Sequence, residues 1–334
     1  MADSATLSNQ IVDLADSTRD YHILQELQIG GDEWRNELLL FIKPEVFLVP
    51  NRSQRLAAAQ LVLDQIAEFK AAIHGVVLVG GPALEAKTIM NRHYGYINVL
   101  SRSASTVLAE AERQRIQTTL GLPTALRIYG GHEYLQAHPE TDAVSLEQLW
   151  LSKKSQKLRS GFYIQSYQAG AENFVLVNGF HPAQLAHFTG ADRRIVLILL
   201  HSNTDWRILR NEMVGLTFPE KATPGSIRGT LYAHSGQYGF ESVTIANNGV
   251  HLSAGPVECV FEIMNFFGRL LDLNPAQQTP LLLRRLLQRG LSLEQALRVV
   301  ENPPVTSNGK TTDLFSATED WDTPDAVELW LKQK

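Results

Sequence analysis

The sequence predicts an α+β fold in which helices cover a four-stranded antiparallel sheet. Continuous apolar runs of strand length occur at 36–44, 74–81 and 193–201, which is typical of buried strands. Between the first two runs and after the second, residues 53–72 and 82–95 place apolar side chains at helical spacing. Two helices on one face of such a sheet define the ferredoxin-like arrangement, and this is the arrangement we expect.

The first predicted strand follows a polar N-terminal segment to which we assign no chemistry. Residues 1–34 are mostly polar and leave room for one short helix. The strand ends at Pro44, which has no N–H to donate to a ladder. Asn51 and Ser53 are candidate caps for the first helix. Pro82 suits the first turn of the helix that follows the second strand.

The remaining core elements lie far downstream. After the third strand, residues 203–213 predict a short helix, and 218–229 predict a loop rich in proline and glycine. Strand-like stretches within 230–249 are expected to supply the fourth strand. A helix from Pro256 to about Leu271 completes the pattern.

Additional chain interrupts and extends this core. We expect residues 1–35 to form an N-terminal extension, 36–271 the core domain and 272–334 a C-terminal helical extension. Residues from about 98 to 178 interrupt the core pattern and predict an inserted subdomain rather than a second independent domain. A hairpin is expected at 160–179, where two apolar runs flank a turn.

The C-terminal extension predicts three kinds of local structure. Residues 279–300 show helical spacing, and the segment rich in proline, asparagine and threonine that follows is expected to be a mobile loop. The acidic stretch 319–330 predicts a solvated terminal helix rather than an interaction motif.

Composition excludes several classes of protein. With 334 residues the chain is long enough for a buried core, and its net charge of −5 offers no attraction to nucleic acid or anionic membrane. Cys259 is the only cysteine, which excludes an internal disulfide and a cysteine-based zinc site and is typical of a reducing compartment. The N-terminus lacks a secretory signal, and no apolar run reaches the roughly 18 residues of a membrane span. We therefore expect a cytoplasmic protein.

The segment 248–267 holds the strongest candidate for chemistry. His251 is predicted in a loop just before the helix that begins at Pro256, where backbone N–H groups attract anions such as phosphate. Glu262 lies eleven residues further along, from where its carboxylate could fix the imidazole tautomer and leave one ring nitrogen as nucleophile. Ser253 could complete this network. By itself a histidine at a helix start is more often a capping or packing residue. The upstream segments therefore decide between a structural and a catalytic role for His251.

The loop upstream offers groups that bind phosphate. Thr217 supplies a hydroxyl, and Arg228 supplies a guanidinium that can donate two parallel hydrogen bonds to a phosphate. No GxxxxGK[ST] segment occurs, which excludes a Walker-type site. Seven other histidines show no metal-ligand spacing, so packing or surface roles are expected for His74, His132, His138, His181, His187, His201 and His234.

The order and spacing of these pieces resemble the motifs of the nucleoside diphosphate kinase family. Lys43 in FIKPE is similar to the strand-end lysine of the family's KPD-type motif, with Glu45 in place of the aspartate. Tyr94 in the His93-Tyr94 pair resembles the family's phosphate-contacting tyrosine. The segment PGSIRG resembles the family's PGTIRG signature, so the resemblance implies phosphate contacts for Thr217 and Arg228.

The catalytic segment of that family is similar to residues 248–267. The resemblance makes His251 the nucleophile, supported by Ser253 and Glu262, and places Asn248 near the ribose. It implies a nucleoside-diphosphate-kinase-like fold. It also implies two in-line transfers, in which ATP or another nucleoside triphosphate phosphorylates the histidine and a nucleoside diphosphate takes the group.

The resemblance covers roughly 36–97 and 180–267, and it has departures. A second phosphate-binding arginine of the family falls at Asn211, so that contact is missing unless Arg210 replaces it. The glycine after the nucleophile is Leu252. The insertion lies where the family forms the lid over the base, which leaves the acceptor open.

The resemblance also implies the cofactor and the assembly. Mg²⁺ is expected with the bound nucleotide, and no metal site built from protein ligands is predicted. A homo-oligomer is expected, with a dimer preferred. Three functions are compatible with the sequence: a nucleoside diphosphate kinase, a phosphotransferase redirected to a non-nucleotide acceptor, and a non-catalytic nucleotide-binding protein.

Overall fold

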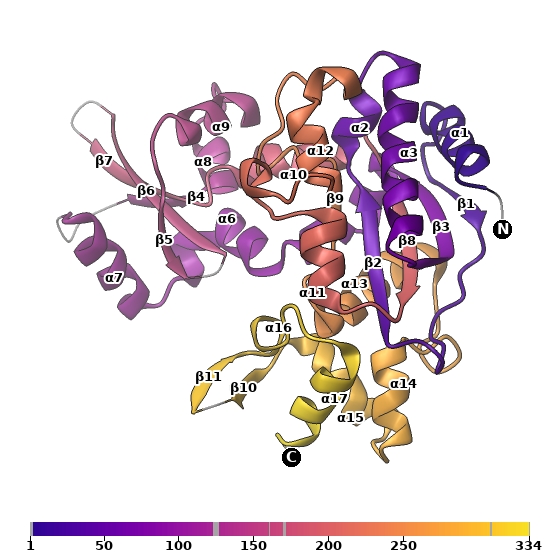
Figure 1. The fold of residues 1–334 in the computed structure, drawn as a ribbon. Helices are drawn as coiled ribbons and strands as arrows, with labels where there is room; N and C mark the ends of the chain where they lie inside the picture. Colours follow the sequence, from indigo (N-terminus) through magenta and orange to yellow (C-terminus); the bar gives the residue numbers. More distant parts are fainter. Residues whose placement is uncertain (1–2, 123–126, 160, 170–171, 308, 334) are drawn as a thin grey trace. The chain divides into compact units, whose positions relative to one another are not determined.

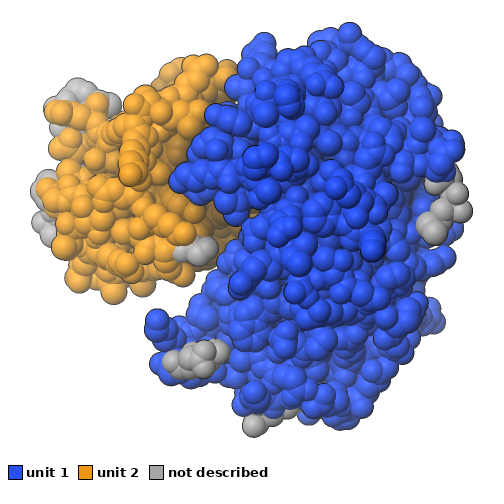
Figure 2. All heavy atoms as spheres, in the orientation of Figure 1, with its two compact units in different colours: residues 1–87, 191–334 blue, residues 88–190 orange. Residues whose placement is uncertain are grey.

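The computed structural model describes residues 3–122, 127–159, 161–169, 172–307 and 309–333. The chain divides into two compact units (Figure 2). The first holds a five-stranded and a two-stranded sheet, and the second holds a four-stranded sheet. The first unit comprises residues 1–87 and 191–334, and the second comprises residues 88–190. Helices and antiparallel strand pairs occur in both units, so the α+β class is confirmed.

The sheet of the first unit has five strands (Figure 1). The three predicted apolar runs form its central part as β2 (Asn36–Ile42), β3 (Ala72–Gly80) and β8 (Arg194–Ser202). Strand order is β1-β3-β8-β2-β9, and every neighbouring pair is antiparallel. The prediction of four strands was therefore wrong, because β1 (Tyr21–Gln25), from the N-terminal segment, pairs with β3 at one edge.

The fourth predicted strand was misplaced. Residues 230–249 contain no strand; the C-terminal part of α12 (Ile227–Ala233) and a 3-10 turn at Ser235–Tyr238 form there instead. The Ser226 side chain caps α12 by accepting from the Gly229 N–H, which favours a helix at this point. The sheet is completed by β9 (Val250–Leu252), which pairs with β2.

The continuous apolar pattern of β2 and β8 reflects burial on both faces. Every residue of the two strands is buried, and they pair in register from Asn36 opposite Ser202 to Ile42 opposite Val196. Helix α13 (Pro256–Leu271) packs on β2, and α3 (Arg52–Glu68) packs on β3. Both helices were predicted, and α13 has the predicted bounds.

One predicted helix is divided into two shorter ones. The helix expected over 82–95 is divided into α4 (Gly81–Ala86) and α5 (Ile89–His93). Thr88 between them has a φ of 52°, a left-handed conformation that a helix does not continue through. The division coincides with the end of the first segment of the first unit at Lys87.

The second unit contains the predicted insertion together with a helix on each side of it in sequence. Its sheet has the order β4-β7-β6-β5. Strands β6 (Phe162–Ala169) and β7 (Glu172–Val177) form the predicted hairpin, and β4 (Arg127–Gly130) runs parallel to β7. Strand β5 comprises Gln156–Arg159. The helices of this unit are α5, α6 (Gly95–Val107), α7 (Glu110–Leu120), α8 (Gly131–Ala137), α9 (Ala143–Leu151) and α10 (His181–Thr189).

The C-terminal extension departs from its prediction in three places. The helix expected over 279–300 ends near Gly290, whose φ is 89°, and becomes α14 (Leu281–Gln288) and α15 (Leu293–Leu297). The expected mobile loop holds a hairpin of β10 (Pro304–Ser307) and β11 (Lys310–Asp313).

The terminal helix was expected to be solvated, yet one of its faces is buried. Helix α17 (Thr323–Leu331) buries Val327 and Trp330 in an apolar cluster with α13 and α14. Short helices complete the first unit, namely α1 (Ser4–Ala15), α2 (Pro44–Leu48), α11 (Trp206–Ile208) and α16 (Leu314–Ala317). None of the described helices is long and apolar enough to cross a membrane.

Candidate active site

His251 lies on strand β9, and the prediction that it lies on a loop was wrong. It pairs with Phe41 of β2, and the two rings stack with centroids 4.4 Å apart and planes 19° apart. A fifth of the His251 side chain, 21%, is exposed. The sheet therefore fixes the ring on one face while one edge stays accessible to solvent.

A buried carboxylate holds the imidazole, as the spacing predicted. Glu262, on α13, is fully buried, and its Oε1 lies 2.7 Å from His251 Nε2. Ser253 Oγ donates to Glu262 Oε2 at 2.5 Å, and it also lies 3.3 Å from the Leu39 N–H. The structure thus brings together the three residues predicted as nucleophile and support.

Burial and nearby cations keep the imidazole neutral. Burial above all, together with the positive charges of Lys43, Arg228 and Arg210 and against the opposing effect of Glu258, lowers the pKa of His251 to about 3. A ring with this pKa is uncharged at neutral pH, so one ring nitrogen carries a lone pair instead of a proton.

Lys43 and Asn248 lie together where β2 ends. Lys43 is the N-cap residue of α2, and its Nζ donates to Asn248 Oδ1 at 2.8 Å and to the Ala246 carbonyl at 3.1 Å. Burial lowers the pKa of Lys43 to about 8, with Glu45 opposing the shift. The ammonium is therefore desolvated, which strengthens its attraction for an anion.

Arg228 anchors the loop and the nucleophile strand at once. It belongs to the first turn of α12 and donates from one Nη to the Gly215 carbonyl at 2.8 Å and from the other to the Val250 carbonyl at 3.0 Å. Val250 directly precedes His251 in β9. Burial lowers the pKa of Arg228 to about 10, so the group remains a cation at neutral pH.

Two carboxylates complete the surroundings, and only one was noticed in the sequence. Glu45, noted as a replacement for aspartate, accepts from the Gly249 N–H at 2.8 Å. Glu258, which was missed, accepts from the Ala254 N–H at 2.6 Å, and burial together with Glu262 raises its pKa to about 7. An acid in the first turn after Pro256 is a capping signal that could have identified it.

The two other predicted site residues are Thr217 and Tyr94. Thr217 lies in an exposed loop segment between two short helical turns. Tyr94 belongs to the second compact unit, where its ring meets those of His181 and Phe188 edge-on, with centroids 5.0 Å and 6.1 Å away. The assembled group of predicted residues is therefore Lys43, Arg228, Asn248, His251, Ser253 and Glu262.

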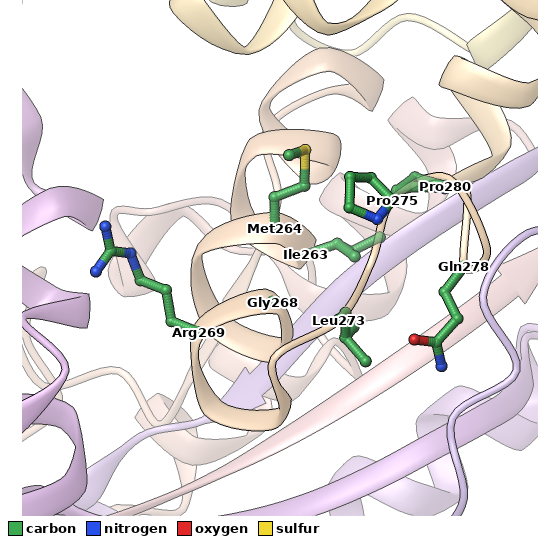
Figure 3. Close-up of a pocket in the computed structure, with 8 residues that line it drawn as sticks. All are labelled: Ile263, Met264, Gly268, Arg269, Leu273, Pro275, Gln278 and Pro280. Carbon is green, nitrogen blue, oxygen red and sulfur yellow. The ribbon is translucent and has the colours of Figure 1, made fainter. Parts of the chain in front are cut away.

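A separate hollow of about 190 Å³ lies along the second half of α13 (Figure 3). Apolar side chains such as Met264 and Leu273 line much of it, together with Arg269 and Gln278. One Nη of Arg269 donates to the Lys87 carbonyl at 3.2 Å. The lining contains no histidine or carboxylate, so this hollow offers no nucleophile, and the candidate chemistry stays at His251.

Comparisons with known proteins give a distant structural likeness. A scan against protein-family models found no match, and a search of curated proteins found none at the threshold used. Among solved structures, the chain is similar to an NDP kinase from Pyrobaculum aerophilum, with a TM-score of 0.32 and 20% sequence identity. The match covers 70% of this chain and 96% of that chain. It records a distant structural relationship, and the family resemblance stays a prediction.

Proposed function

We propose that the chain is a nucleotide-dependent phosphotransferase that moves the γ-phosphoryl group of a nucleoside triphosphate through a phosphohistidine at His251 to a nucleoside diphosphate. The observation that carries the proposal is the hydrogen-bonded series His251–Glu262–Ser253, whose histidine lies on the strand that Arg228 anchors. A neutral, oriented imidazole near fixed cations is suited to accepting a phosphoryl group.

The hydrogen bond to Glu262 defines which nitrogen reacts. Because Nε2 donates to the carboxylate, the ring carries its proton on Nε2 and its lone pair on Nδ1. Nδ1 attacks the γ-phosphorus, the bond from that phosphorus to the bridging oxygen breaks, and its electron pair leaves with the nucleoside diphosphate. The new N–P bond makes the ring cationic, and Glu262 stabilises that charge. A terminal oxygen of a second diphosphate then takes the phosphoryl group, and the N–P electron pair returns to Nδ1.

The cations would stabilise the moving phosphoryl group. Lys43 and Arg228 both affect the pKa of His251 through their charge, so the phosphoryl group would travel through their field. Asn248, held by Lys43, is proposed to face the ribose. Phosphate contacts by Thr217 and Tyr94 rest on the family resemblance and remain proposals.

Mg²⁺ would enter with the nucleotide. Glu45, Glu258 and Glu262 accept hydrogen bonds from protein N–H or O–H groups, so these carboxylates already have protein donors. This donor set fits a magnesium ion that is held by the substrate phosphates and by water. When bound, the ion would neutralise part of the phosphate charge.

The remaining expectations are proposals as well. The order β3-β8-β2-β9 with antiparallel pairing supports a ferredoxin-like core to which β1 is added. We propose a homo-oligomer, with a dimer preferred, and a cytoplasmic location without nucleic-acid or membrane partners.

The test is phosphoryl transfer with two histidine variants. Purified protein is incubated with Mg²⁺ and γ-labelled ATP and then chased with nucleoside diphosphates. We expect acid-labile, base-stable label that is absent in His251→Ala and moves to the diphosphates. His234→Ala, which removes an exposed histidine of the same unit, is the matched control and should retain the label. Label that persists in His251→Ala, or no label in the unaltered protein, would refute the proposal.

A second candidate function is transfer to a non-nucleotide acceptor. It is favoured by the size of the second unit, which has its own sheet and two apolar clusters and thus far exceeds a loop. Label that forms on His251 but resists every diphosphate would select this candidate. Binding of MgADP without any label would instead select a non-catalytic nucleotide-binding protein.

A further inference from the structure

Arg210 is a site cation that the C-terminal extension holds. It lies in the π-helical turn Leu209–Val214. One of its Nη atoms is 2.7 Å from Asp320 Oδ1, and the other is 2.9 Å from Glu319 Oε1. Its side chain is 23% exposed. The guanidinium therefore lies between two carboxylates.

Arg210 acts electrically on the candidate active site. Its positive charge lowers the pKa of His251, of Arg228 and of Glu258. An arginine whose field reaches these groups also lies within the field of any polyphosphate bound among them. Its charge therefore matters to an anionic substrate, whether or not the two touch.

The two carboxylates come from a segment that is fixed against the turn joining β9 to α13. The Asp320 N–H donates to the Ala254 carbonyl at 2.9 Å. At Gly255 an added Cβ would lie 2.3 Å from the Thr318 carbonyl oxygen, so only glycine allows the two backbones to approach this closely. The segment 318–320 is thus built onto the turn that carries Ser253.

The charge balance of this arrangement disfavours a second anion. Two carboxylates and one guanidinium sum to −1, and a phosphate would compete for the same donor fork. We propose, on the basis of the phosphotransferase function above, that Glu319 and Asp320 are affinity-determining residues which occupy Arg210 and weaken polyphosphate binding at the site. The extension therefore sets how tightly the site holds its nucleotide.

The test is the affinity for MgADP of the double variant Glu319→Gln and Asp320→Asn, measured by titration calorimetry. The neutral amides keep the shapes of the side chains, and Asp320, with a φ of 63°, becomes asparagine, which tolerates that conformation well. We expect MgADP to bind about three- to tenfold more tightly, because the carboxylates no longer compete with it for Arg210. This factor corresponds to the free energy of a partly exposed ion pair. Glu328→Gln is the matched control, because Glu328 pairs with Arg289 on the same extension, and it should leave the affinity unchanged.

A triple variant tests whether the effect requires Arg210. When Arg210→Gln is combined with the double variant, the gain in affinity should disappear. A gain that persists without Arg210, an equal gain in Glu328→Gln, or no gain at all would overturn the proposal. Thermal unfolding of each variant identifies any that is not folded. If the double variant is not folded, the MgADP affinity of the single variant Glu319→Gln, which keeps Asp320, is measured instead, and a smaller gain is expected. Failure of the phosphotransferase proposal is read separately, from the absence of label on His251.

Discussion

Two histidines of the same sheet each bind a buried carboxylate, and the two pairs differ in surroundings rather than in geometry. His251 Nε2 lies 2.7 Å from Glu262 Oε1, and His201 Nε2 lies 2.9 Å from Glu37 Oε1. His251 is 21% exposed, whereas His201 is 1% exposed. A hydrogen-bonded histidine and carboxylate are therefore not by themselves a sign of chemistry.

The neighbours of each pair explain the difference. Glu37 also accepts the Gly30 N–H at 2.6 Å and the Leu281 N–H at 2.8 Å, so it joins the N-terminal segment to the C-terminal extension. The His201 ring packs against His74, with centroids 4.1 Å apart. Around His251, in contrast, cations gather and one ring edge is accessible. Exposure and positive charge distinguish the candidate reactive pair from a structural one.

The largest expected effect is that Glu37 and Glu262 differ in what their replacement impairs, stability for Glu37 and phosphorylation for Glu262. Glu37→Ala should lower the free energy of unfolding by about 3 kcal/mol, because two backbone N–H groups and an imidazole lose a buried acceptor. Urea denaturation measures this loss, and the folded fraction should still become phosphorylated. Glu262→Gln should instead slow phosphorylation of His251 by about 100-fold. If folded Glu37→Ala protein also lost its label, the contrast between the pairs would fail.

The next effect concerns the cations around the His251 pair. The pKa of Lys43 is lowered to about 8, so the ammonium is charged below that pH and loses its proton as the pH rises through it. We expect kcat/KM for MgATP to fall about tenfold per pH unit above pH 8. Lys43→Arg keeps the charge and should remove this decline. A wild-type profile that stays flat to pH 9.5 would mean that the Lys43 charge is not used.

The smallest effect concerns Glu258, which has no equivalent beside His201. Its pKa is raised from 4.5 to about 7 in the folded protein, so the folded state holds the proton more tightly than the unfolded state does. The stabilising contribution is present below pH 4.5 and is lost as pH rises through about 7. Glu258→Gln should remove about 1 kcal/mol of this pH dependence, allowing for partial exposure. Denaturant midpoints at pH 5 and pH 8 measure this pH dependence. If the midpoint changed equally with pH in the wild type and in Glu258→Gln, the raised pKa of Glu258 would be contradicted.

Features governed by local pattern were predictable from the sequence. The apolar runs of β2 and β8 are continuous because both faces of these strands are buried. Helix α13 begins at Pro256, whose missing N–H suits a first turn, and ends before Asp272, whose φ is 50°. The interval from His251 to Glu262 correctly indicated that the carboxylate reaches the imidazole, because α13 returns Glu262 to the sheet.

Features that depend on distant partners could not be predicted. Strand β1 is a half-exposed edge strand with little apolar pattern, and only pairing with β3 defines it. Thr88 gives no local signal for its left-handed conformation, since a β-branched residue rarely adopts it. The contact of Arg210 with Asp320 joins positions 110 residues apart, and no spacing rule connects them.

Strand β9 contributes only three residue pairs to the sheet, so its position depends on fixed points at its entrance. Lys43 binds the Ala246 carbonyl and Asn248, Glu45 accepts from the Gly249 N–H, and Arg228 holds the Val250 carbonyl. The chain between α12 and residue 246 is thus tethered at both ends. Each doubling of such a loop costs only about 0.6 kcal/mol of closure entropy, so a reporter sequence grafted between the exposed Glu241 and Ser242 should leave His251 in place.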